Sequence, residues 1–249
     1  MNNPSFHDYS KFYDLLYSDK NYLLESDYIH NILIDHNISC GDLLEFGCGT
    51  GKHARILCER NYSVHGIEKS KEMVNLANMA KGFTIHNGDI CSYSLDRKFD
   101  AVLSLFHVIS YQTKNDDLQS VFRNAASHLK SGGLFIFDFW FSPAVYENKP
   151  SIRIKNVSNT KFELTRIAEP TEYPSKNQVE VKYTIFALNK KTGVYTRLDE
   201  THVLRHYSLP EIDYFAEIAG FERVNAEEFL TKHPPSVNAW GVCVTLKKR

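Results

Sequence analysis

The spacing of apolar residues changes along the chain and predicts three kinds of local structure. Between Phe6 and Ile34, apolar residues recur at intervals of three and four, which predicts an amphipathic helical arm. From about residue 41 to 140, short apolar runs alternate with helical patterns. The predicted strands of this part are 42–46, 63–68, 83–86, 99–105 and 134–139, and the predicted helices are 52–60, 70–80 and 116–129. Strands that alternate with helices indicate a parallel sheet covered on both faces.

The period shortens to two between residues 141 and 207. Predicted strands at 152–157, 162–168, 179–188 and 195–207 are joined by turns, which indicates an antiparallel insert. A helix capped at Ser208 and strands at 222–229 and 239–246 then return to the first pattern. We therefore expect a doubly wound α/β fold with a seven-stranded, mostly parallel sheet. Its parts would be an arm (1–40), a core domain (41–140 and 208–249) and the insert (141–207).

Composition narrows the class of protein. The chain has 249 residues, 43% of them hydrophobic, and 29 Lys and Arg balance 30 Asp and Glu. Without a basic surplus we expect no nucleic-acid partner. No apolar stretch is long enough for a membrane span or a secretion signal, and the five cysteines form no Cys-x-x-Cys pair. A cytoplasmic protein with no bound metal and no membrane contact is the expectation.

A glycine-rich segment follows the first predicted strand. Gly47, Gly49 and Gly51 alternate, and a dinucleotide fingerprint would need a further glycine where the chain has Lys52. A phosphate-binding P-loop would need Ser or Thr where the chain has His53. The segment therefore fits neither of these nucleotide-binding motifs.

Glu45-Phe46-Gly47-Cys48-Gly49-Thr50-Gly51 resembles the motif of class I S-adenosylmethionine-dependent methyltransferases, within them the small-molecule and sugar N-methyltransferase group. The resemblance implies a Rossmann-like fold and S-adenosyl-L-methionine as cofactor. It also implies that Glu68, at the end of the second strand, accepts hydrogen bonds from the ribose hydroxyls. Asn87-Gly88-Asp89-Ile90 resembles the adenine site, where Asp89 would accept from the exocyclic amine and Ile90 would pack on the ring. The implied cofactor-binding residues are Glu45, Gly47, Cys48, Gly49, Gly51, Glu68, Lys69, Asp89, Ile90, Phe106 and Tyr17.

The acceptor is expected beyond the fourth strand, because ligands of open α/β sheets bind at the carboxyl ends of the strands. The loop there carries His107, our first candidate for a general base, and Tyr111, our second. Alternatively, His107 packs on the adenosine or forms a hydrogen bond with the main chain, and the sequence does not distinguish these roles from that of a base. The arm resembles the N-terminal lid of sugar methyltransferases, which makes Tyr13 a third catalytic candidate. For Tyr9 and Tyr17, ordinary packing on the core is the alternative.

The insert resembles the acceptor-side sheet of sugar N-methyltransferases. Arg205 and His206 on its last strand are predicted to bind an anionic acceptor, although alternate residues of any strand also face solvent. We expect methyl transfer to an N or O atom of a small molecule, such as a nucleotide-linked or surface-polysaccharide sugar. The alternatives are a protein or nucleic-acid methyltransferase and a non-catalytic cofactor-binding module. A homodimer is possible, because the sequence does not determine the oligomeric state.

Overall fold

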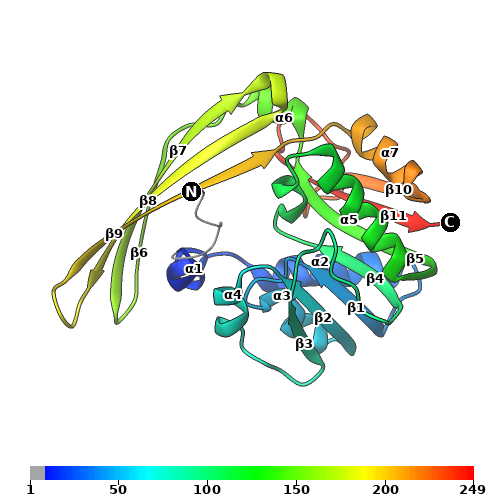
Figure 1. Cartoon of the computed structure of the whole chain (residues 1–249), viewed down its shortest axis with the longest axis horizontal. Coiled ribbons are helices and arrows are strands. Elements are labelled where there is room, and N and C mark those ends of the chain that lie inside the picture. The colour runs from blue at the N-terminus through cyan, green and yellow to red at the C-terminus, as the bar shows by residue number, and fades with distance from the viewer. Residues whose placement is uncertain (1–8) are drawn as a thin grey trace.

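The computed structural model describes residues 9–249 and contains two sheets in that range (Figure 1). The larger sheet has seven strands in the order β10-β11-β5-β4-β1-β2-β3 among the described residues. β1 to β5 run parallel, and β11 is antiparallel to both of its neighbours. The strands are β1 (Gly41–Phe46), β2 (Tyr62–Glu68), β3 (Phe83–Asn87), β4 (Phe99–Ser104), β5 (Leu129–Trp140), β10 (Phe221–Glu228) and β11 (Gly241–Lys248). This confirms the doubly wound fold.

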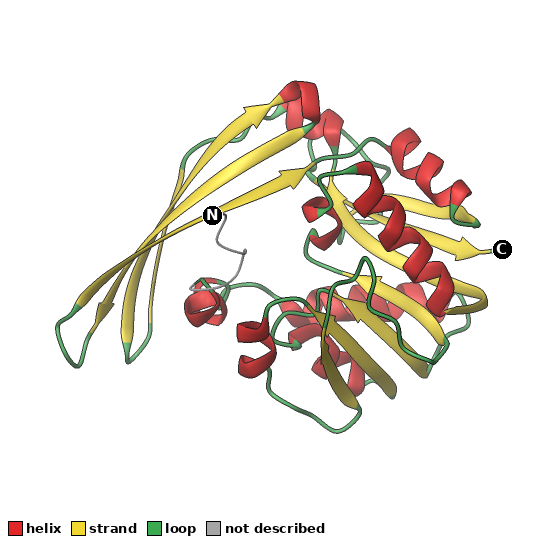
Figure 2. Ribbon diagram, in the orientation of Figure 1, coloured by secondary structure: helices red, strands yellow, loops and turns green. Residues whose placement is uncertain are grey.

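Helices cover both faces of this sheet (Figure 2). One face buries Ile29 and Leu33 of α2 and Leu57 of α3, while the other buries Phe122 of α5 and Phe215 of α7. The central strands are buried on both sides, which is why they appear in the sequence as continuous apolar runs. The helices are α2 (Tyr22–Asp35), α3 (Lys52–Cys58), α4 (Lys71–Leu76), α5 (Asn115–His128), α6 (Ser142–Glu147) and α7 (Leu209–Ile218).

The smaller sheet is fully antiparallel and arches out from the core over the first helix, α1 (Ser10–Leu16) (Figure 1). Its inner face packs on that helix through Leu164 and Ile185, which contact Tyr9, Phe12 and Leu16. The sheet therefore forms one wall above the strand ends of the core. Its strands are β6 (Arg153–Ser158), β7 (Phe162–Tyr173), β8 (Gln178–Asn189) and β9 (Tyr195–Arg205).

Several local predictions need correction. The predicted helical arm consists of two helices, α1 and α2, and Asn21 caps α2 by accepting a hydrogen bond from the Leu24 N–H at 2.9 Å. The predicted start at Phe6 lies outside the described residues. α4 ends at Leu76, since Ala77 is extended, and Ser208 makes no side-chain cap to α7. Helix α6, inside the predicted insert, was not expected.

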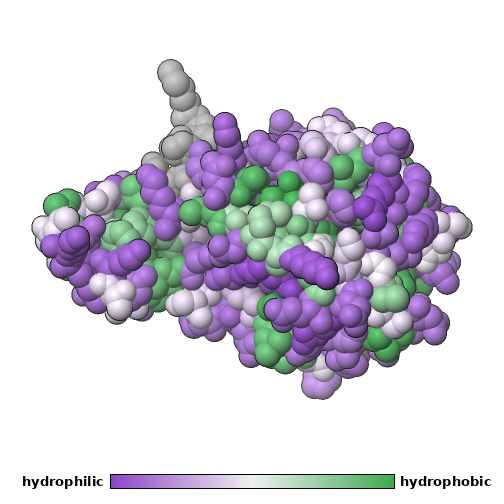
Figure 3. All heavy atoms as spheres, turned by 90° about the horizontal axis from the view of Figure 1, so that it is seen from below, coloured by the Kyte–Doolittle hydropathy of each residue, from purple (hydrophilic) through white to green (hydrophobic). Residues whose placement is uncertain are grey.

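The domain boundaries given above stay a prediction. Among residues 9–249, no helix is both long and apolar enough to cross a bilayer. Mostly hydrophilic residues cover the face of the molecule in Figure 3, with apolar patches between them.

Candidate active site

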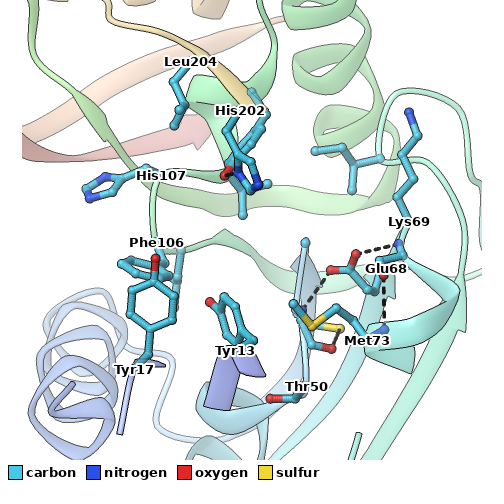
Figure 4. A pocket seen from close by; sticks show the side chains of 18 of the residues that line it. Tyr13, Tyr17, Thr50, Glu68, Lys69, Met73, Phe106, His107, His202 and Leu204 are labelled. Carbon is cyan, nitrogen blue, oxygen red and sulfur yellow. Dashed lines mark hydrogen bonds between the residues drawn. The ribbon is translucent and has the colours of Figure 1, made fainter. Parts of the chain in front are cut away.

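A cavity of about 830 Å³ lies between the carboxyl ends of the core strands and the inner face of the smaller sheet. Its walls come from the glycine loop, the ends of β2 and β3, the loop after β4, and α1 and the smaller sheet (Figure 4). Twelve of the sixteen predicted site residues line it. They are Tyr13, Tyr17, Gly47, Cys48, Gly49, Glu68, Lys69, Asp89, Ile90, Phe106, His107 and Tyr111.

The three glycines of the loop serve different needs. All have positive φ, of 67°, 55° and 76° for Gly47, Gly49 and Gly51, where a side chain is strained. A Cβ at Gly47 would lie 2.6 Å from Val108, and one at Gly51 would lie 2.4 Å from Phe83. A Cβ at Gly49 would meet nothing within 4 Å. The outer glycines are therefore required for packing, and Gly49 leaves room for a ligand against the main chain.

Glu68 is held in one orientation by main-chain donors. Its two carboxylate oxygens accept from the N–H groups of Gly49 at 2.9 Å and Ser70 at 2.7 Å. Burial raises its pKa above the ordinary value, against the opposing effect of these donors. A fixed carboxylate at the cavity wall is suited to accepting hydrogen bonds from a vicinal diol.

Glu45 lies behind the cavity wall rather than in it. It is 1% exposed, and its Oε2 has no hydrogen-bond partner among the described residues. Burial raises its pKa to about 8, and the charge of Glu68 adds to this. His53, which lines the cavity, has Nδ1 3.7 Å from Glu45 and Nε2 2.8 Å from Glu25. This unpaired carboxyl oxygen is therefore buried behind the cavity wall, next to His53.

Asp89 is already engaged at the predicted adenine end. It accepts from Lys69 Nζ at 2.8 Å and from the N–H of Cys91 at 2.9 Å. Burial acts to raise its pKa, but these donors hold it below the ordinary value. Because the Lys69 side chain is 78% exposed, it is free to swing aside for a ligand amine.

The loop after β4 is strained, because Phe106 and His107 both have left-handed backbone angles, with φ of 66° and 61°. The buried carboxylate of Asp138 holds the loop: its Oδ2 lies 3.1 Å from the N of His107 and 2.7 Å from the Nδ1. Burial opposes ionisation of Asp138, but His107 keeps its pKa lowered. The His107 ring turns away from Tyr13 and Glu68 (Figure 4). Asp138 was not predicted, although an acid within an apolar strand is a signal.

Three residues that the sequence did not reveal line the part of the cavity next to the smaller sheet, which we call the acceptor half. Arg166 of β7, Tyr183 of β8 and His202 of β9 all face it from the smaller sheet. The Arg166 guanidinium donates to the hydroxyls of Tyr9 at 3.2 Å and Tyr17 at 3.4 Å. Within residues 9–249 it has no carboxylate partner within 4.0 Å.

Four predicted residues lie outside the cavity wall. Gly51 and Glu45 support it from behind. Arg205 pairs with Glu211 and donates to Asn115 Oδ1 at 2.7 Å. His206 is buried against Ser142 Oγ at 2.8 Å, and burial together with Arg205 lowers its pKa to about 4. The guanidinium in the cavity wall is thus Arg166, not Arg205.

Comparison with known proteins gives the same class. A family model described as a methyltransferase domain matches residues 43–133. An uncharacterized methyltransferase of Bacillus cereus is 30% identical over 168 residues, covering 66% of this chain and 75% of the relative. The dTDP-3-amino-3,4,6-trideoxy-α-D-glucopyranose N,N-dimethyltransferase of Streptomyces venezuelae is 26% identical over 181 residues, covering 72% and 76%. The sugar N-methyltransferase KedS8 of a Streptoalloteichus species superposes with a TM-score of 0.84 at 20% identity, over 100% of this chain and 96% of that one.

The fold and the matches to known methyltransferases identify an enzyme that uses S-adenosyl-L-methionine. The chain belongs to the methyltransferase family. The predictions of cofactor and enzyme class are confirmed.

Proposed function

We propose that this enzyme transfers methyl groups to the amino group of a nucleotide-linked sugar. The observation that carries the proposal is the wall of the acceptor half, where Arg166 lies among tyrosine hydroxyls without a carboxylate partner in the described chain. A partly buried guanidinium favours an anionic partner, and Arg is well suited to phosphate. The Streptomyces venezuelae relative is named for a substrate that joins such an anion to an amino sugar.

The residues that would hold the donor are Glu68 for the ribose, Asp89 and Ile90 for the adenine, and the main chain around Gly49. The bound donor supplies an electrophilic methyl group on a positively charged sulfur. Tyr13 of α1 and Tyr17, the residue that follows this helix, line the cavity and would close over that end, and burial raises the pKa of Tyr13 far above its ordinary value. Tyr13 therefore remains a neutral hydroxyl, and both side chains would orient the acceptor by hydrogen bonding.

The acceptor proton has two candidate receivers. His107 is oriented by Asp138, but its ring faces Trp140, with the centroids 6.0 Å apart. Tyr111 lies in the acceptor half, and its hydroxyl is hydrogen-bonded to a buried histidine. This geometry favours Tyr111 as the group that contacts the acceptor nitrogen.

The test offers the enzyme two matched acceptors. Purified protein is incubated with S-adenosylmethionine and either dTDP-3-amino-3,4,6-trideoxy-α-D-glucopyranose or the analogue with a hydroxyl at position 3. We expect release of S-adenosylhomocysteine and N-methylated product only with the amine. Methylation of the hydroxyl analogue alone, or turnover only with a protein or nucleic-acid acceptor, would overturn the proposal.

Two further expectations belong to the proposal. A cytoplasmic location is supported by the free state of all five cysteines. The homodimer stays a prediction, and light scattering with the bound cofactor would check it.

A further inference from the structure

Three side chains form a continuous hydrogen-bonded line that leads away from the acceptor half of the cavity. The Tyr111 hydroxyl, at the end of the short helix η1 (Val108–Tyr111), lies 2.7 Å from Nδ1 of His202. Nε2 of His202 lies 2.6 Å from Oε1 of Glu200, two residues earlier on β9. The N–H of Tyr9 donates to the other carboxylate oxygen of Glu200 at 3.3 Å. Tyr111 and His202 line the cavity, and Glu200 lies behind it.

We propose that Tyr111, His202 and Glu200 form a proton relay that removes the proton from the methylated nitrogen. Tyr111 is the member that contacts the acceptor, while His202 and Glu200 are positioning residues that act through it. The inference rests on the proposed function, because it concerns a nitrogen acceptor in the same cavity.

The bonds and protons that change during the transfer are as follows. The acceptor nitrogen forms an N–C bond with the methyl carbon as the S–C bond breaks, and the electron pair of that bond stays on sulfur. The nitrogen is left as an ammonium. Its proton passes to the Tyr111 oxygen while the Tyr111 proton passes to Nδ1 of His202. The Nε2 proton of His202 passes to Glu200, and no oxidant or reductant is required.

Burial explains why Tyr111 needs the two residues behind it. Burial raises the pKa of Tyr111 well above its ordinary value, and the nearby Tyr183, Tyr17, Tyr9 and Glu200 add to the effect. A lone tyrosinate is therefore too costly at neutral pH. If Tyr111 gives up its own proton as it accepts another, no tyrosinate forms. A neutral His202 with its proton on Nε2 has the lone pair on Nδ1 that this step requires.

The surroundings of His202 keep the line dry. His202 is 2% exposed and Glu200 is 8% exposed. The rings of Tyr9, Tyr183 and Tyr111 pack around His202 with centroids 5.5, 5.1 and 5.7 Å away. Within residues 9–249, the charged groups on this side are Glu200 on the same strand and Arg166 on β7, which lies over the Tyr183 ring at 5.2 Å.

The three side chains could instead have a purely structural role and only anchor β9 to η1. Two experiments distinguish this role from a proton relay. The first uses histidine labelled with ¹⁵N in the full chain with S-adenosylhomocysteine bound, and needs no acceptor. Long-range ¹H–¹⁵N spectra report which ring nitrogen of His202 carries the proton, and His202→Gln assigns the signal. We expect the neutral form protonated at Nε2. A form protonated at Nδ1, or an imidazolium, would overturn the relay even if the acceptor were not an amino sugar.

The second experiment uses Glu200→Gln, which keeps an acceptor for Nε2 but cannot take up a proton. With dTDP-3-amino-3,4,6-trideoxy-α-D-glucopyranose as acceptor, we expect kcat to fall roughly 10²-fold at about pH 6.5, with KM little changed. The loss should shrink to a few fold at about pH 9.5, because hydroxide in the solvent can then remove the proton from the methylated nitrogen without the relay. Combining Glu200→Gln with Tyr111→Phe should add little to the loss from Tyr111→Phe alone.

The control is Thr201→Val, on the same strand and exposed on its other face, which should behave as the parent. An equal loss at every pH, full additivity in the double variant, or parental turnover by Glu200→Gln would each overturn the relay. If the parent itself fails to methylate this amine, the proposed function fails, while the histidine spectra still decide the relay.

Discussion

The main-chain N–H of Gly49 donates to Oε2 of Glu68 at 2.9 Å, so the loop after β1 and the end of β2 form one structural unit. The glycine that leaves space for the ligand also fixes the acid that would bind its ribose. Changes at these two positions should therefore affect cofactor binding in separable ways.

Removing the acid should weaken binding without unfolding the protein. Glu68→Ala loses charge-assisted hydrogen bonds worth about 1.5–3 kcal/mol, which is roughly a 10- to 150-fold rise in Kd. Titration calorimetry with S-adenosylhomocysteine measures it, with exposed Glu59→Ala as the control. Parental affinity in Glu68→Ala would mean that the ribose lies elsewhere.

The glycines should separate binding from folding. In Gly49→Val the new side chain points into open space in the cavity, so cofactor binding should be abolished, while the positive φ of 55° strains the valine and lowers the melting temperature to some extent. In Gly51→Val the Cβ meets the Phe83 ring at 2.4 Å, so the melting temperature should fall much further. Thermal unfolding with and without cofactor gives both quantities. Similar melting temperatures for the two variants would contradict the assignment of Gly49 to ligand binding and Gly51 to packing.

Glu45 should make the unliganded enzyme less stable as pH rises. Its pKa is about 8 in the fold, above its ordinary value of 4.5, because burial favours the neutral acid. The neutral form therefore contributes stability that is complete below about pH 4.5 and is lost as pH rises toward about 8. Glu45→Gln escapes this loss, which is on the order of 5 kcal/mol in full.

We therefore expect the melting temperature of Glu45→Gln to exceed that of the parent by a margin that grows between about pH 5 and about pH 8. Scanning calorimetry without ligand measures this margin. A margin that stays constant or shrinks over the same range would show that Glu45 is ionised in the unliganded fold.

Arg166 should govern acceptor binding rather than cofactor binding. Arg166→Gln removes the guanidinium from the acceptor half, so KM for the nucleotide-linked amino sugar should rise roughly 10- to 100-fold, as expected for a charged hydrogen bond of about 1.5–3 kcal/mol. Affinity for S-adenosylhomocysteine should not change. Arg197→Gln on β9, which breaks an exposed pair with Asp199, is the matched control. An unchanged KM would remove Arg166 from the acceptor site.

His107 and Tyr111 should differ in their contribution to turnover. His107→Gln should cost less than the roughly 10²-fold that a positioned base contributes, because its ring faces Trp140 and its Nδ1 lies against Asp138. Tyr111→Phe should reach or exceed that loss. Single-turnover rates with the amine acceptor compare the two, and a larger loss in His107→Gln would restore His107 as the base.

The parts of the site that could be predicted from the sequence are those held by local segments. Glu68 and Asp89 each follow a strand whose apolar run is visible in the chain, and the glycine loop is contiguous. Arg166, Tyr183 and His202 could not be found in this way, since they meet only through the register of three antiparallel strands. Until that register is known, each could equally face solvent.

The position of Arg205 could not be predicted for a similar reason, because it depends on which face of the strand each residue occupies. Side chains along a strand alternate between faces, and His202 and Leu204 on β9 line the cavity. Arg205 is the next residue and turns to the opposite side, where it meets Glu211. The sequence indicated a cation on the insert, but the face to which each residue points depends on contacts with distant segments.

The N-terminal arm is bonded both to the core domain and to the smaller sheet. Asp14 of α1 accepts from Oγ1 of Thr50, within the glycine loop, at 3.0 Å, while Asp19, in the turn after α1, pairs with Lys155 of β6 at 2.6 Å. We predict that the arm opens to exchange spent donor, and these two bonds imply that the same motion would loosen the wall that encloses the acceptor. For an acceptor that is methylated twice, this linkage predicts a distributive enzyme: free monomethyl product should build up in solution early in the reaction and be consumed later.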